Sequence, residues 1–162
     1  NNGYKNVILI NKAVSDKNAR LKLFLSEDNL GDHRIYDSHD GRKFVEIESI
    51  RLDDHFRDNS VKIDFIKMDI EGAEYGAIRG MAELFKKAEN LKMISEFWPF
   101  GLQKSGVEPT EYLNTLLAYG FKIYELNERE KKTDSVSVEK LLKIYTAGKQ
   151  NHTNLLCVKE EE

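Results

Sequence analysis

Three acidic side chains gather at one junction in the middle of the chain. Asp69, Glu71 and Glu74 follow residues 63–68, whose near-continuous apolar run is typical of a strand buried on both faces. A carboxylate in such a place can take a proton from a hydroxyl nucleophile or hold that hydroxyl by a hydrogen bond. Ligands of open α/β sheets bind beyond the carboxyl ends of the strands. The spacing therefore places candidate catalytic residues at Asp69 and Glu71.

The same acids also have a purely structural interpretation. Asp69 could cap the helix that follows, and Glu71 and Glu74 could complement the positive end of its dipole. Each such contact contributes roughly 0.3–2 kcal/mol to helix stability. Because the spacing alone names no reaction, capping and catalysis both stay open here.

A fourth acid, Glu96, ends the strand expected at residues 91–97 and should face the same crevice. Its structural alternative is to pair with a backbone amide or with Lys67. Trp98 and Phe100 follow and could line an acceptor pocket. Aromatic residues pack in cores more often, so we expect both of them in the core.

Residues 26–43 are polar and form the longest loop candidate, a length that is often functional or mobile. His33 and His39, together with Asp37 and Asp40, could bind a metal. Their spacing matches no strong metal motif, so a polar surface loop is the expectation and any metal stays unknown.

The surrounding segments alternate between strand and helix patterns, which predicts an α/β fold with a mainly parallel sheet. Strand patterns occupy residues 7–14, 21–25, 44–50, 63–70, 91–97, 121–126 and 154–159. Helix patterns begin after Glu71, at Thr110 and at Val138, and Gly120 is expected to close the second helix. Residues 127–134 are highly charged and predict a solvated excursion.

The first helix is expected to run unbroken to Ala88, with its apolar stripe at the 3.6-residue period. Gly72, Gly76 and Gly80 lie on one face of it at four-residue spacing. Because a glycine inside a helix costs about 1 kcal/mol, we expect these glycines to allow close approach of the helix to the sheet.

Composition limits the partners of this 162-residue chain. A net charge of −3 and a pI near 5.9 argue against a nucleic-acid partner bound through bulk positive charge. No apolar run approaches the roughly 18 residues that span a bilayer, so no membrane span is expected. The single cysteine, Cys157, cannot form an internal disulfide, which fits a reducing compartment and a cytoplasmic location.

Residues 67–74, Lys-Met-Asp-Ile-Glu-Gly-Ala-Glu, resemble the signature of the FkbM-type methyltransferases, a branch of the S-adenosylmethionine-dependent class I fold. Further segments resemble that family in the same order, at residues 11–16, 49–54, 95–99, 120–124 and 154–156. The resemblance runs from about residue 5 to residue 159. It implies a partial class I, Rossmann-like sheet that ends in an antiparallel strand pair.

The resemblance also implies a reaction and its residues. An enzyme of this family would transfer a methyl group from S-adenosylmethionine to a small-molecule or glycan acceptor, here a hydroxyl of a sugar or secondary metabolite. Asp69, Glu71 and Glu96 would be catalytic, and in some related enzymes an acid at this strand end binds a divalent metal. Lys12, Ala13 and Val14 would contact the adenine, largely through their backbone; their structural alternative is an ordinary strand-to-loop transition.

One part of the family pattern is absent from this sequence. None of its ten glycines forms a Gly-x-Gly turn after an apolar strand, and the acid that holds the ribose is not found. We therefore expect one methyltransferase-like domain over residues 1–162 that is incomplete at its N-terminus and inactive alone. The alternative is a non-catalytic remnant that serves as an interaction module.

An incomplete sheet would leave the strand at residues 63–70 without a neighbour on one side. An unpaired apolar edge is a template for pairing with another chain. Either residues 7–14 move in beside that strand, or two chains form a homo-oligomer through the open sheet edge, which is the outcome we expect.

Overall fold

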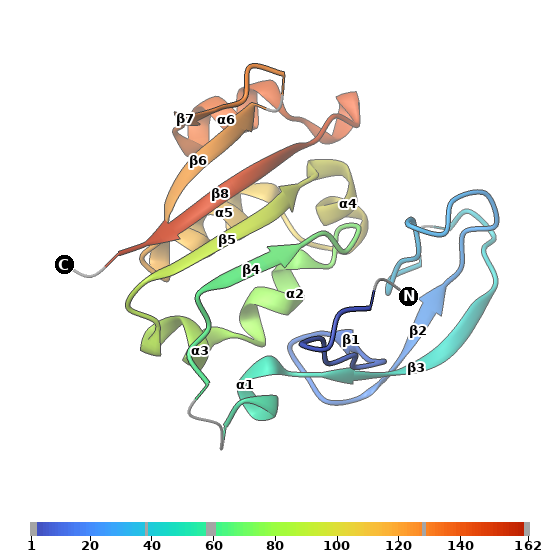
Figure 1. Cartoon of the computed structure of the whole chain (residues 1–162). Coiled ribbons are helices and arrows are strands. Elements are labelled where there is room, and N and C mark those ends of the chain that lie inside the picture. Colours follow the sequence, from blue (N-terminus) through green and yellow to red (C-terminus); the bar gives the residue numbers. More distant parts are fainter. Residues whose placement is uncertain (1–2, 38, 58–60, 128, 161–162) are drawn as a thin grey trace.

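The computed structural model describes residues 3–37, 39–57, 61–127 and 129–160. The chain forms an α/β structure with a larger sheet in the order β4-β5-β8-β6-β7 and a smaller sheet in the order β1-β3-β2 (Figure 1). The strands are β1 (Ala13–Val14), β2 (Arg20–Phe24), β3 (Phe44–Ile50), β4 (Phe65–Met68), β5 (Leu91–Phe97), β6 (Lys122–Asn127), β7 (Lys132–Ser135) and β8 (Thr153–Lys159). The helices are α1 (Leu52–His55), α2 (Glu74–Arg79), α3 (Ala82–Lys87), α4 (Pro99–Lys104), α5 (Pro109–Ala118), α6 (Val138–Ile144) and the 3₁₀ helix η1 (Ala147–Lys149).

Most strand pairs of the larger sheet are antiparallel. Only β4 and β5 run parallel there, whereas β8 is antiparallel to both β5 and β6, and β7 is antiparallel to β6. The expected α/β class and the antiparallel pair β6–β8 are confirmed, but the expectation of a mainly parallel sheet was wrong. The reason is that the reversed strand β8 lies between β5 and β6, so it creates two antiparallel neighbours at once.

The hydrophobic core lies on one face of the larger sheet. Leu91, Met93 and Phe97 of β5 are buried, and they belong to one cluster with buried residues of α2, α3, α5 and α6. On the opposite face of β5, Lys92 is exposed and Glu96 is half-buried. One face of the sheet therefore packs against the core, and polar side chains are found on the other face.

The strand β4 is an edge strand, as expected for an incomplete sheet, but the expectation that both of its faces are buried was wrong. Met68 is its only buried residue, and Phe65 is 54% exposed. Among the described residues, β4 has β5 as its one strand neighbour. The hydrophobic side chains of residues 63–68 are therefore only partly covered by other residues. One edge of β4 carries backbone groups without a strand partner among the described residues.

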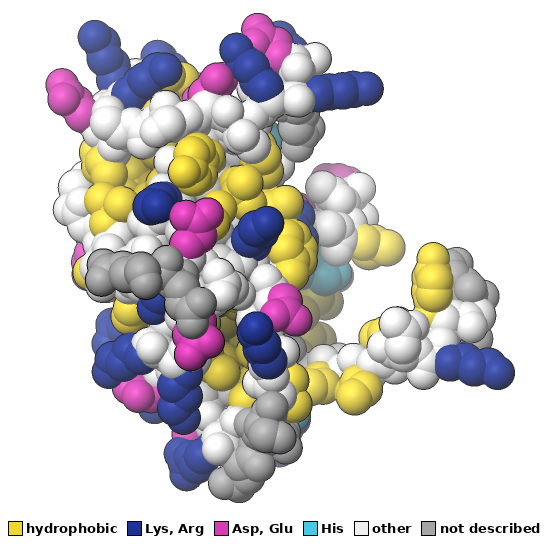
Figure 2. Space-filling view, turned by 60° about the vertical axis from the view of Figure 1, so that its left-hand side comes forward, with side chains coloured by type: hydrophobic (Ala, Val, Ile, Leu, Met, Phe, Trp, Pro, Cys, Tyr) yellow, Lys and Arg dark blue, Asp and Glu magenta, His cyan; other side chains and the backbone are white. Residues whose placement is uncertain are grey.

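The expected strand at residues 7–14 was wrong except at its end. Only Ala13–Val14 forms a strand, which pairs with β3 and not with β4. Ile8 and Leu9 are 89% and 91% exposed, since no described strand covers them. Figure 2 shows hydrophobic side chains that reach the surface between Lys, Arg, Asp and Glu side chains.

The helix expected after Glu71 is broken into α2 and α3. A Cβ on Gly80, at the end of α2, would lie 2.1 Å from the carbonyl oxygen of Ser15. The carboxylate of Asp53 accepts hydrogen bonds from the amides of Glu83 and Leu84 at 3.0–3.1 Å, which caps the start of α3. Two segments from distant parts of the chain thus approach the place where the apolar stripe is divided into two helices.

The glycines of this region approach other segments than the sheet. A Cβ on Gly72 would lie 2.6 Å from the backbone of Gly101 in α4, whereas a Cβ on Gly76 would meet nothing within 4 Å. The expected approach of helix to sheet was therefore wrong. Gly120 closes α5 with a φ of 86°, as expected.

Two further expectations need correction or completion. Residues 127–134 were expected as a solvated excursion, but β7 pairs with β6 there as an antiparallel hairpin. The helices α1 and α4 were not expected at all.

In β8, at the middle of the larger sheet, Cys157 is a free, fully buried thiol. No helix in the described part of the chain has both the length and the hydrophobicity to cross a bilayer.

Candidate functional site

The junction between β4 and α2 reverses through two left-handed residues. Glu71 has a φ of 59° and Gly72 a φ of 93°. The glycine is required, because its φ disfavours other residues and a Cβ would meet the backbone of Gly101. Glu71 has no such freedom, and a non-glycine residue in this region costs on the order of 1–3 kcal/mol. The surrounding contacts must therefore stabilise the conformation of Glu71.

Glu74 has a structural role at the junction between β4 and α2. Its Oε1 accepts a hydrogen bond from the amide of Ile70 at 2.9 Å, and the residue is only 1% exposed. The N-cap of α2 is Ala73, with no side-chain capping bond. The capping interpretation of Asp69 was therefore wrong, and Asp69 instead accepts a hydrogen bond from the Lys67 ammonium at 3.1 Å.

Asp69 and Glu96 meet at the ends of two neighbouring parallel strands. The register pairs Lys67 with Ile94 and Met68 with Ser95, so the next pair is Asp69 and Glu96, on the face opposite to the core. Burial, with a contribution from the Asp69 charge, raises the pKa of Glu96 to about 7, against the opposing effect of Lys67. The charge of Lys67 thus favours the ionised form of Glu96. Oε2 of Glu96 is nevertheless buried without a hydrogen-bond partner among the described residues.

Glu71 belongs to the same group of acids. Burial raises its pKa to about 7, and the charges of Glu96, Asp32 and Asp69 act in the same direction, whereas Arg34 lowers it. A carboxylate whose pKa lies near neutrality suits proton transfer, because both of its protonation states are populated at working pH. The site therefore holds two acids that can exchange protons near pH 7.

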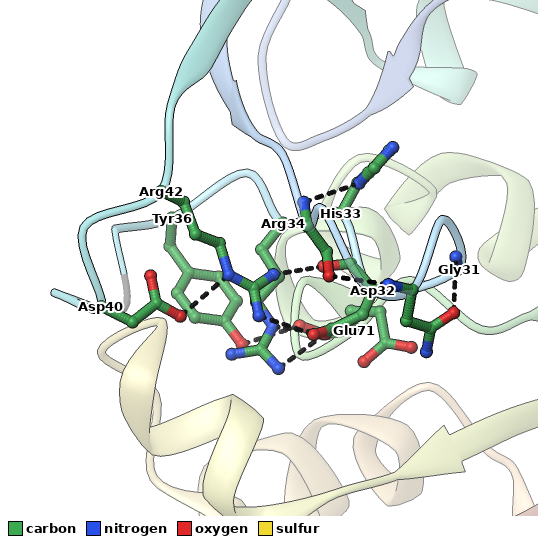
Figure 3. A network of polar contacts seen from close by, with 10 residues as sticks. Gly31, Asp32, His33, Arg34, Tyr36, Asp40, Arg42 and Glu71 are labelled. Carbon is green, nitrogen blue, oxygen red and sulfur yellow. Dashed lines mark hydrogen bonds and ion pairs between the residues drawn. The ribbon is translucent and has the colours of Figure 1, made fainter.

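A polar network covers this junction from the loop between β2 and β3 (Figure 3). The carboxylate of Asp32 pairs with two guanidinium groups, Arg34 and Arg42, each at 2.6 Å. Arg42 also contacts Asp40 at 2.8 Å. The Tyr36 hydroxyl donates a hydrogen bond to the backbone carbonyl of Glu71 at 2.8 Å.

Trp98 lies outside the hydrophobic core and supports this network. The Arg34 guanidinium is 5.0 Å from the centre of its ring, and a Cβ on Gly101 would lie 2.2 Å from the ring. Phe100 is tilted against Trp98 with 5.5 Å between ring centres, and it is also outside the core. The expectation of core positions for these two aromatic residues was wrong.

A cavity of about 370 Å³ lies between the smaller sheet and the β4–α2 junction. Lys12, Ala13 and Val14 line it together with Asp69 and Glu71. Its apolar lining comes from residues Ile10, Leu23, Ile35, Ile47, Ile70 and Ala73. The volume falls in the range of small-molecule sites. The residues expected to contact the adenine and two of the expected catalytic acids thus share one cavity, while Glu96 is not among its lining residues.

No sequence pattern selected Asp32, Arg34 or Tyr36. The only signal was the length and polarity of their loop, which drew attention to its histidines instead. His33 accepts a hydrogen bond from the amide of Ser26, and His39 lies 3.6 Å from Asp37. In the described residues, no group of three or more His, Cys, Asp and Glu side chains is arranged to hold a metal.

The relationship to known proteins agrees with this arrangement. Comparisons with curated proteins and with solved structures returned no match. The family model of the methyltransferase FkbM domain matches residues 1–123, about three quarters of the chain, including the β4–α2 junction. The chain therefore belongs to the FkbM methyltransferase family.

Proposed function

We propose that the protein catalyses methyl transfer from S-adenosylmethionine to a hydroxyl of a sugar or secondary metabolite. One observation carries the proposal: Asp69 and Glu96 end adjacent parallel strands on one face, next to Glu71 and the cavity. Family membership supports the reaction class. The acceptor class is our inference from the carboxylates, which are suited to binding and deprotonating a hydroxyl.

The three acids have separate roles in this proposal. Glu96 accepts the proton of the acceptor hydroxyl, because its pKa of about 7 leaves a basic form at neutral pH and its Oε2 lacks a partner among the described residues. Asp69, paired with Lys67, orients the hydroxyl by a hydrogen bond. Glu71 adds negative charge at the rim of the cavity, where a cation would be stabilised.

The cavity suits part of the cofactor. Its apolar walls beside Ala13 and Val14 fit a flat adenine ring, and the acids at its rim fit a positively charged sulfonium. When bound, S-adenosylmethionine would supply an electrophilic methyl group. Lys12, Ala13 and Val14 would hold the adenine end, largely by their backbone. No Gly-x-Gly turn is present in the sequence to hold the remainder, so we expect weak binding.

A methyl-transfer assay tests the proposal. Because this chain is expected to be inactive alone, a form completed with a Gly-x-Gly cofactor-binding segment is incubated with methyl-labelled S-adenosylmethionine and with a panel of sugars and polyhydroxylated metabolites. Transfer that is lost in Glu96→Gln but kept in Asp64→Asn, an exposed acid just before β4, would support the proposal. Equal transfer by both variants would refute the role of Glu96.

The rival function is a non-catalytic interaction module. It is favoured by the absence of a Gly-x-Gly turn and by the exposed hydrophobic side chains near Ile8 and Leu9. No transfer to any acceptor by the completed form, even at saturating donor concentration and with the protein folded, would favour this alternative.

A further inference from the structure

Glu71 is held in an unfavourable backbone conformation at the centre of the proposed site. Its φ of 59° is rare for a residue other than glycine, asparagine or aspartate. Strained residues of this kind persist only when neighbouring structure stabilises them, and they concentrate at functional sites. The question is which groups hold Glu71 in place.

Residues 32–36, here called the clamp segment, supply the contact from outside the junction. The segment is attached to β2 by two backbone hydrogen bonds between Phe24 and Arg34, at 2.7 and 3.1 Å. From this attachment, the Tyr36 hydroxyl donates to the Glu71 carbonyl at 2.8 Å. The clamp segment therefore links the smaller sheet directly to the strained residue.

Arg34 contacts Trp98, which lies just before α4, and acts on Glu71 through its charge. Arg34 is 9% exposed, and its guanidinium lies between the Asp32 carboxylate and the Trp98 ring. Its charge favours the ionised form of Glu71, whereas Asp32, Asp69 and Glu96 disfavour it. Arg34 is the one cation among the groups that act most strongly on this carboxylate.

We propose that Arg34 and Tyr36 are positioning residues for Glu71, because the Tyr36 hydroxyl fixes its left-handed backbone and the Arg34 charge balances the negative charges around its carboxylate. The smaller sheet then contributes to the site, because it anchors the clamp segment. This inference rests on the proposed role of Glu71 in methyl transfer. Its test needs no methyl donor or acceptor, so it stands or fails separately from the activity.

The charge effect of Arg34 is tested by titrating side-chain carboxyls by ¹³C NMR in the full chain. In Arg34→Met, we expect the Glu71 midpoint to rise by about one unit, the low end of the range for a lost opposite charge, because Glu71 is only half-buried. Burial and nearby backbone amides dominate the Glu74 titration, so it should stay unchanged as an internal reference. Arg34→Lys keeps the charge and should restore the Glu71 midpoint.

Arg57→Met is the matched control, because Arg57 pairs with Asp54 beside α1. It should leave both Glu71 and Glu74 unchanged. Equal shifts of Glu71 and Glu74 in Arg34→Met would mean a general loss of structure and would overturn the proposal. An unshifted Glu71 in a folded Arg34→Met variant would overturn it as well.

The backbone effect of Tyr36 is tested by Tyr36→Phe, which removes only the hydroxyl. Amide hydrogen exchange at Ala73, which donates to Ile70 across the strained residue, should become roughly five-fold faster, the effect of one lost hydrogen bond. Exchange at Met93 in β5 should stay the same. Tyr4→Phe, at a 73% exposed tyrosine, is the control. Unchanged exchange at Ala73 in Tyr36→Phe would contradict the role of the hydroxyl.

Discussion

The carboxylate of Glu74 accepts a hydrogen bond from the amide of Ile70 at 2.9 Å in a place that is almost sealed from solvent. Burial is the largest effect on this acid, and it raises the pKa of Glu74 from 4.5 to about 7. The folded state therefore binds a proton more tightly than the unfolded state does. The stability that this gives is complete below about pH 4.5 and is lost as pH rises through about 7.

Glu74→Gln should remove this pH dependence. The amide keeps an oxygen for the Ile70 hydrogen bond and carries no charge, so the variant should equal the wild type near pH 4.5 and exceed it at pH 8 by up to about 3 kcal/mol. Urea unfolding at both pH values measures the difference. Glu89→Gln, at an exposed acid, should show no such gain at pH 8. A destabilised Glu74→Gln at pH 8 would show that the ionised carboxylate is favourable in the fold.

In a complete version of the enzyme, Asp69→Asn should affect turnover much more than stability. Loss of a positioning or basic carboxylate lowers rates by about 10²–10⁴-fold. Asp69 is 54% exposed and pairs only at the surface with Lys67, an interaction worth about 0–1 kcal/mol. Initial rates of methyl transfer and thermal melts give the two quantities, with Asp64→Asn as control. Full activity with a lowered melting temperature would assign Asp69 a structural role.

Gly80 and Gly76 form a matched pair of positions at the end and in the middle of α2. Gly80→Ala should destabilise the fold by about 1–3 kcal/mol, because its Cβ would lie 2.1 Å from the Ser15 carbonyl oxygen. Gly76→Ala should stabilise it by about 0.5–1 kcal/mol, because the Cβ meets nothing within 4 Å. Chemical denaturation of both variants checks the opposite signs. Equal effects would contradict the close contact between Gly80 and Ser15.

The 162-residue chain should bind S-adenosylmethionine weakly. The apolar cavity offers a place for the adenine, but the sequence contains no Gly-x-Gly turn for the methionine part. Titration calorimetry measures the affinity directly. A dissociation constant in the micromolar range would contradict the prediction and would indicate that another segment replaces the turn.

The elements best predicted from the sequence are those whose pattern is local and continuous. The strand β5 was predicted at its observed bounds, because alternate residues from Leu91 to Phe97 are buried against the core. The end of α5 was also predicted, since the left-handed φ of Gly120 is a property of glycine itself. The candidate acids Asp69 and Glu96 were found because each ends a recognisable strand.

The features that were missed depend on contacts between distant segments. The break between α2 and α3 lies where Ser15 and Asp53 approach these helices, and no pattern within residues 71–88 reveals that approach. The hairpin of β7 is charged and exposed, so it lacks the apolar alternation that identifies a strand. Arg34 and Tyr36 enter the site only through the fold of a long polar loop. Sequence periodicity identifies core-facing elements better than it identifies the groups that assemble around them.

The open edge of β4 should cause the chain to associate. Phe65 is 54% exposed, and β4 lacks a second strand neighbour among the described residues. An unpaired hydrophobic edge favours pairing between chains. Light scattering over a dilution series should show a mass that falls on dilution, and Phe65→Lys should reduce it. A compact monomer at high concentration would contradict this expectation.

The reactivity of Cys157 can report how fast the core beside the larger sheet opens. Burial raises the pKa of its thiol to about 12, and β8 lies between β5 and β6. Cys157 belongs to the core between this sheet and its helices, so the reactive thiolate becomes available when that core opens. Since this is the only cysteine of the chain, the rate of its labelling by a thiol reagent measures the rate of that opening, and no engineered probe is needed.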